Sequence, residues 1–95
     1  MKIKFFGVGQ EPCYKEIENS LEAMQELVGG YIEMIELENR NYLVCNEEGK
    51  IRNLPYNKYV TDEGTDGKTY IIGDIYGNYF IVGVNNDGEC EDIHE

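Results

Sequence analysis

The chain has 95 residues, and its 19 Asp and Glu residues outnumber its 8 Lys and Arg residues, so its formal net charge is −11. The length fits one domain, and a hydrophobic content of 41% excludes general disorder. The acidic balance argues against direct binding of DNA, RNA or an anionic membrane through a basic patch, although acidity also serves solubility.

The sequence carries no signal for export or membrane insertion. No apolar run approaches the ~20 residues that cross a bilayer. The first nine residues, MKIKFFGVG, make a poor signal peptide, because their apolar run is short and Glu11 soon follows. We therefore expect a cytoplasmic protein. Cys13, Cys45 and Cys90 are odd in number and widely spaced, which favours free thiols.

The N-terminal residues 1–9 are predicted to form an edge or near-edge strand. Ile3 and Phe5 alternate with Lys2 and Lys4, which gives one apolar face and one half-wet face. Residues 9–17 contain a proline and are expected to be a connection without regular structure.

Residues 19–28 predict an amphipathic helix. Asn19 is expected to cap its N-terminus, with Glu22 reaching back toward the cap, and Gly29 or Gly30 to end it in the left-handed conformation. So short a helix is marginal alone and must dock on a sheet. Its apolar stripe consists of Leu21, Met24, Leu27 and Val28.

Residues 31–37 and 42–46 are predicted to pair as a β-hairpin across the short turn between them. The first segment has no purely polar face, so we expect it to be a central strand. Cys45 lies in the apolar run of the second segment, and we expect it to be a small core residue.

The C-terminal half is less regular. Pro55 bars a central strand over residues 51–60, and a short helical turn over residues 56–59 is expected. Residues 61–69, TDEGTDGKT, predict a surface loop. Two extended segments should follow, broken at Gly73 and Gly77.

These elements predict an α+β fold: a small, mainly antiparallel sheet with one amphipathic helix packed on a face. We expect residues 1–88 to form a single domain. Residues 89–95 are rich in Glu and Asp, and we expect them to be a frayed acidic C-terminal tail.

Several segments of the chain resemble the domain-of-unknown-function 3846 family of small proteins from Firmicutes, their phages and mobile elements. They are SLEAMQELVGGYIE (20–33), LVCNEEGK (43–50), LPYN (54–57) and, more weakly, FIVG (80–83). The resemblance implies a compact α+β domain of phage or mobile-element origin and brings no catalytic residues. The sequence departs from the family pattern at residues 61–68 and after Val84.

Motifs for catalysis or metal binding are incomplete. Gly7-Val8-Gly9 lacks the further residues of a phosphate loop, and no EF-hand alternation orders the acidic residues near Asp66. The single histidine, His94, forms only one loose pair with Cys90. We therefore expect no enzyme, no bound metal and no other cofactor.

Tyrosine is the more informative residue, because the chain has eight and no tryptophan. Tyrosine combines rigid contact area with a polar tip, which suits binding surfaces, but it is also common in sheets. Tyr56, Asn57 and Tyr59, together with Arg52, are our candidate contact patch, and Arg40 is a further candidate binding residue.

Two functions remain open. The first is a non-catalytic accessory protein that binds a host protein with a basic surface; an inhibitor of a nucleic-acid-handling defence system would be one such protein. The alternative is a sponge for a nucleotide or other small molecule, which requires Arg40, Lys50, Arg52 and Tyr56 to converge. The oligomeric state stays open.

Overall fold

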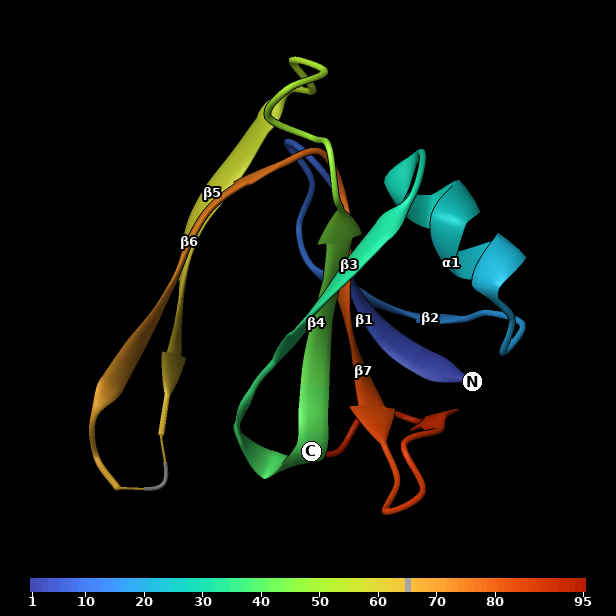
Figure 1. Cartoon of the computed structure of the whole chain (residues 1–95), viewed down its shortest axis with the longest axis vertical. Coiled ribbons are helices and arrows are strands. Elements are labelled where there is room, and N and C mark those ends of the chain that lie inside the picture. The colour runs from blue at the N-terminus through green and yellow to red at the C-terminus, as the bar shows by residue number, and fades with distance from the viewer. Residues whose placement is uncertain (65) are drawn as a thin grey trace.

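The structure is a computed structural model that describes residues 1–64 and 66–95. It consists of a main antiparallel sheet, a two-stranded hairpin and one α-helix, which confirms the predicted α+β class (Figure 1). The elements are β1 (Lys2–Phe6), β2 (Cys13–Glu16), α1 (Leu21–Val28), β3 (Ile32–Glu36), the 3-10 turn η1 (Glu38–Arg40), β4 (Asn41–Asn46), β5 (Tyr56–Glu63), β6 (Thr69–Tyr76), β7 (Tyr79–Val84) and β8 (Cys90–Glu91).

The main sheet runs in the order β2-β1-β7-β4-β3, and β8 pairs with β7. Its two faces carry different cores, because successive side chains of a strand point to opposite faces. Val44 points to the helix side, and its neighbours Leu43 and Cys45 point to the other. The helix-side core consists of Ile3, Phe5, Met24, Val28, Val44, Phe80 and Val82.

Helix α1 is capped by Ser20 at its N-terminus and by Gly29 at its C-terminus. The Ser20 hydroxyl accepts a hydrogen bond from the Ala23 N–H at 3.1 Å. Asn19, our predicted cap, instead donates its side-chain amide to the Cys90 carbonyl. Gly29 has φ 79°, as the Gly-Gly pair predicted. No helix in the described part of the chain is long and apolar enough to cross a membrane.

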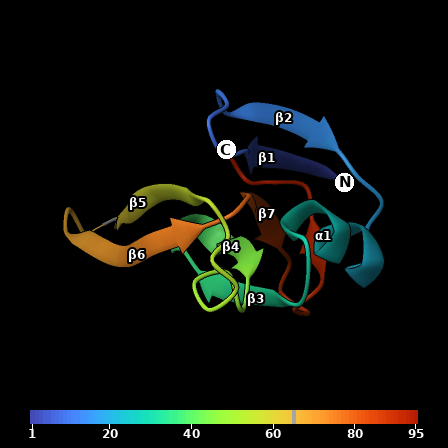
Figure 2. The same cartoon turned by 90° about the horizontal axis from the view of Figure 1, so that it is seen from above.

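The β5–β6 hairpin, residues 56–76, projects from the main sheet and is called the arm below. Figures 1 and 2 show it extending away from the side of the molecule that carries α1. The two strands pair from Tyr56 opposite Tyr76 to Glu63 opposite Thr69, with irregularities in register that bend the ladder. The base of the arm continues directly into the centre of the sheet, because β7 begins at Tyr79.

Three predictions of secondary structure were wrong. The segment expected to be a central strand is the edge strand β3, because β4 alone pairs with it. Residues 56–59 belong to β5 and not to a helical turn; the preceding Pro55 needs no ladder hydrogen bond there. The connection over residues 9–17 contains β2, whose side chains are exposed and show no apolar pattern.

The predicted frayed tail is also wrong. Residues 89–95, called the C-terminal strap, are held against the ends of the main sheet. The Lys2 N–H donates to Asp92 Oδ1 at 2.8 Å, and the Ile93 N–H donates to the Lys2 carbonyl at 2.9 Å. Asn41 and His94 exchange two hydrogen bonds of 2.9 Å. Backbone pairing therefore orders a segment whose composition alone suggested fraying.

Candidate interaction surface

The arm is anchored through one face. Val60 and Ile72 pack against the second core of the main sheet, and Ile75 is 5% exposed within it. Asp62 also points inward, where its carboxylate accepts the backbone N–H of Glu38 at 2.9 Å. These contacts fix the arm's orientation and leave its opposite face to solvent.

An asparagine clamps the base of the arm. The Asn57 side-chain amide donates to the carbonyl of Phe6 at 3.0 Å and to that of Gly77 at 2.9 Å. The Gly77 N–H in turn donates to the Pro55 carbonyl at 2.7 Å. Asn57 was a predicted contact residue, but its side chain points inward and joins β5 to β1 and to the turn before β7.

The tip of the arm is held by its own polar groups. The Gly64 N–H donates to the Lys68 carbonyl at 2.8 Å, and the Tyr70 hydroxyl donates to Asp66 Oδ2 at 2.7 Å. The Tyr70 hydrogen bond, followed by that from the Lys68 N–H, lowers the pKa of Asp66. The same hydrogen bond raises the pKa of Tyr70. Residues 61–63 and 69 of the predicted surface loop thus belong to β5 and β6, Gly64 and residues 66–68 lie between the two strands, and residue 65 is outside the described residues.

The outward-facing side of the arm, called the outer arm face, combines apolar and acidic groups. Tyr56, Tyr59 and Ile71 are 50%, 53% and 69% exposed. Tyr59 lies opposite Asp74 in the ladder, and the Tyr56 hydroxyl donates to Asp74 Oδ1 at 2.9 Å. That hydrogen bond is the main cause of the raised pKa of Tyr56. The face is completed by Thr61, Glu63 and Thr69.

The predicted contact patch is divided by the structure. Tyr56 and Tyr59 share the outer arm face, whereas Arg52 lies in the 47–55 connection and forms an ion pair of 3.3 Å with Glu48. Sequence reasoning missed Ile71 as a surface residue. Ile71 lies in the continuous apolar run Tyr70–Ile72, and only the ladder, which places it opposite Thr61, identifies its outward face.

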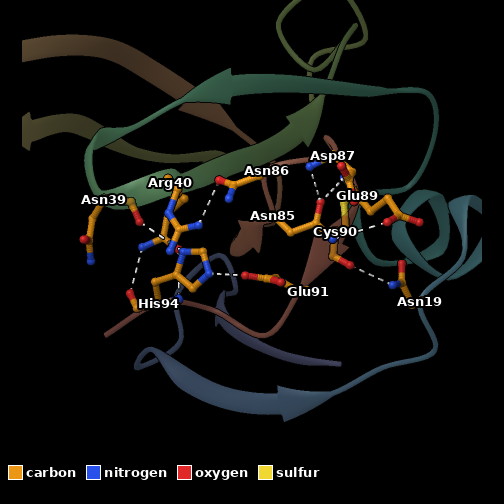
Figure 3. A network of polar contacts seen from close by, with 11 residues as sticks. Asn19, Asn39, Arg40, Asn85, Asn86, Asp87, Glu89, Cys90, Glu91 and His94 are labelled. Atoms are coloured by element: carbon orange, nitrogen blue, oxygen red, sulfur yellow. Dashed lines mark hydrogen bonds and ion pairs between the residues drawn. The ribbon is translucent and has the colours of Figure 1, made fainter.

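Arg40 lies far from Arg52, because the two arginines flank opposite ends of β4. A strand of that length spans about 20 Å. Figure 3 shows Arg40 beside Asn86, to which its guanidinium donates at 3.3 Å. Arg40 therefore does not join Arg52 in one small-molecule site.

A groove of about 240 Å³ runs between β3, β4 and the arm. Its lining residues include Glu33, Lys50 and Asp74. Cys45 lies at the bottom, 4% exposed, as its predicted core position requires. Burial, with Glu33 nearby, raises the pKa of this thiol to about 11, so it is not a thiolate nucleophile at neutral pH.

Three of the acidic side chains considered as cation ligands each accept a hydrogen bond from a different donor group of the chain. Asp62 receives the Glu38 N–H, Asp66 the Tyr70 hydroxyl and Asp74 the Tyr56 hydroxyl. Among residues 1–64 and 66–95, no three His, Cys, Asp or Glu side chains gather as metal ligands would.

A small antiparallel α+β domain with a projecting, tyrosine-bearing arm is the class of protein that this geometry defines. The chain belongs to the family Domain of unknown function (DUF3846), whose family model matches residues 1–95. Neither the curated proteins nor the solved structures contain a significant match to it.

Proposed function

We propose that the chain is a non-catalytic binding protein that docks on a partner protein through the outer arm face. The observation that carries this proposal is the concentration of exposed apolar groups on the arm. Among the described residues, nine large hydrophobic side chains are exposed, and three of them, Tyr56, Tyr59 and Ile71, lie on the outer arm face. Exposed aromatic and aliphatic groups beside polar ones are typical of protein interfaces.

Charge defines the kind of partner. Acidic residues occur on α1, β3, the arm and the strap, so net charge alone does not single out one face. On the outer arm face, however, Glu63 and Asp74 lie among the apolar groups. A partner with Lys or Arg around an apolar centre would complement them, and attraction to the −11 chain would speed encounter.

We propose that this partner is a host protein, in keeping with the phage or mobile-element origin that the family resemblance implies. Proteins that handle nucleic acids present basic surfaces to phosphates. A defence system of that kind is therefore the target class that fits best, with the chain as its inhibitor. The separation of Arg40 from Arg52, at opposite ends of β4, argues against the alternative of a small-molecule sponge.

The test is affinity capture from a Firmicutes lysate with matched variants, followed by calorimetry with each purified candidate. The arm variant is Tyr59→Ala with Ile71→Ala. The control is Tyr31→Ala with Leu21→Ala, which also removes one exposed tyrosine and one exposed aliphatic residue, but beside α1.

We expect a basic host protein that binds the wild type and the control, loses affinity about tenfold or more for the arm variant, and dissociates more readily at high salt. Equal binding by both variants would place the interface elsewhere. Retention of a nucleotide with no protein would favour the sponge.

A further inference from the structure

Three lysines gather with aromatic rings on the arm side of the main sheet, apart from the outer arm face. The Lys2 ammonium lies 5.0 Å from the centre of the Tyr14 ring. Lys4 lies 5.8 Å from the same ring and 5.6 Å from the Phe6 ring. Lys58, which reaches across from the arm, lies 5.1 Å from the Phe6 ring. Each neighbouring pair of lysines therefore shares a ring, and we call this cluster the lysine–aromatic face.

Strand register explains the cluster. In β1, Lys2 and Lys4 alternate with Ile3, which points into the helix-side core. Lys4 lies opposite Tyr14 in the β1–β2 ladder. The Phe6 ring is stacked on Tyr79, with ring centres 4.6 Å apart and planes 5° from parallel. The ammonium groups of the three lysines thus lie over packed aromatic rings. Cation–π attraction between each ammonium group and a ring favours this position.

The positive charge of this face is not neutralised within the chain. Among the described residues, the ammonium groups of Lys2, Lys4 and Lys58 form no ion pair within 4.0 Å, although carboxylates outnumber cations. Glu16, which lies opposite Lys2, pairs with the N-terminal amine at 3.3 Å. The central strands β1, β4 and β7 contain no Asp or Glu.

The acidic end of the strap reaches the edge of this face. Asp92 binds the backbone N–H of Lys2 and not its ammonium group. The nearby Glu95 carboxylate raises the pKa of the Tyr14 hydroxyl. A carboxylate of the chain itself therefore lies near one tyrosine of the cluster.

We propose that the lysine–aromatic face binds a short acidic segment of a partner protein, with its carboxylates between the shared rings and the lysines. Glu95 marks the edge of this site and competes for it. The inference does not depend on the outer arm face, which points the other way. It makes the chain a protein with two surfaces of opposite charge.

An acidic peptide fits this face better than a nucleic acid does. Three lysines can pair with a few carboxylates of a peptide. The long row of phosphates of a nucleic acid would instead lie beside the acidic strap and arm, which repel it. Screening confines the effective charge to about 8 Å at physiological ionic strength, so a short ligand meets mainly the lysines.

The test is an NMR titration of the ¹⁵N-labelled full chain with a peptide of alternating Glu and Ser. A peptide with Gln in place of Glu and an oligothymidylate of equal charge are the comparison ligands. We expect the Glu peptide to shift the amide signals of Lys2, Lys4, Tyr14 and Lys58, and the Gln peptide to leave them unmoved.

Lys4→Glu with Lys58→Glu should weaken peptide binding about tenfold or more. Lys15→Glu with Lys68→Glu, which makes the same change in net charge, should not, because Lys15 lies over Phe5 on the other side of the sheet. The milder variant Lys4→Gln with Lys58→Gln should also weaken binding. It is the control for misfolding of the Glu variant. Glu95→Gln should strengthen it.

Three results would overturn the proposal. They are an absence of shifts up to millimolar Glu peptide, equal shifts with the Gln peptide, and tighter binding of the oligothymidylate than of the peptide.

Discussion

The two faces of the main sheet are closed in different ways. On one face α1 seals a continuous core in which Phe80 and Val82 are fully buried. On the other face the covering elements are the arm and the strap, both extended segments. A helix buries one stripe and shows solvent a polar face, whereas the arm buries one side and presents apolar groups on the other.

This difference separates stability from binding. The helix side supplies the larger buried core, and its exposed apolar groups include Leu21 and Tyr31. The arm side carries the outer arm face and the lysine–aromatic face on elements that add fewer buried contacts. We therefore expect substitutions on the helix side to act mainly on folding, and those on the arm side to act mainly on binding.

The largest expected effect is on the helix-side core. Phe80→Ala removes a fully buried ring and should lower the free energy of unfolding by about 3–5 kcal/mol. Ile71→Ala on the outer arm face should change it by no more than about 0.5 kcal/mol. Urea unfolding of both variants measures the contrast. Similar losses for the two would mean that the arm is part of the folding core.

The second prediction concerns Gly83, where the strap crosses β7. A Cβ atom there would contact the Asp92 carbonyl oxygen and lie 3.1 Å from His94 Nε2. Gly83→Ala should therefore cost about 1–3 kcal/mol by overpacking. Urea unfolding of a chain truncated after Glu91 is the control, because the alanine should be neutral once residues 92–95 of the strap are removed. An equal cost in the truncated chain would show that the strap is not responsible.

The third prediction concerns the anchor of the arm. Asp62→Ala leaves the Glu38 N–H without its acceptor and should cost about 1–2 kcal/mol. Hydrogen exchange should quicken in β5 and β6 and stay slow in β4 and β7, since the main sheet does not need this contact. Uniform loss of protection would mean that arm and sheet open as one unit.

The smallest effect is the pH dependence of the strap. The Glu91 side chain, followed by the Asn39 carbonyl, raises the pKa of His94 above its ordinary value (Figure 3). The folded state therefore holds the imidazole proton more tightly than the unfolded chain does. This stabilisation is complete below pH ~6.5 and is lost as the pH rises through the raised pKa.

An NMR titration of His94 should give a pKa above that of a free histidine, and Glu91→Gln should lower it. Hydrogen exchange in residues 91–94 should quicken, relative to the main sheet, as His94 deprotonates. An ordinary pKa in the wild type would contradict the pairing with Glu91.

The sequence predicted those parts of the fold in which local pattern and tertiary environment agree. The amphipathic stripe and Gly29 gave the helix, and the short turn before Tyr42 gave the β3–β4 hairpin. β2 could not be predicted because its side chains are exposed and show no apolar alternation, although it pairs with the preceding strand β1. The strap could not be predicted because hydrogen bonds to the distant strands β1 and β7 order it.

The candidate site residues that could be predicted are likewise those whose role is visible in the local sequence. Tyr56 and Tyr59 could be singled out because tyrosines in a Pro-flanked segment are visible in sequence. Asn57 was misread because its role depends on two carbonyls, those of Phe6 and Gly77, that only the fold brings near. The lysine–aromatic face escaped notice for a similar reason, since it joins residues from three strands.

Site-directed photo-crosslinking in host cells tests the central claim, that the outer arm face is the contact surface, most directly. A photoreactive phenylalanine analogue replaces Tyr59 on the arm or Tyr31 beside α1, both of which are exposed. The account predicts a covalent adduct with a basic host protein from position 59 and none from position 31. Adducts from position 31 alone, or equal adducts from both, would contradict it.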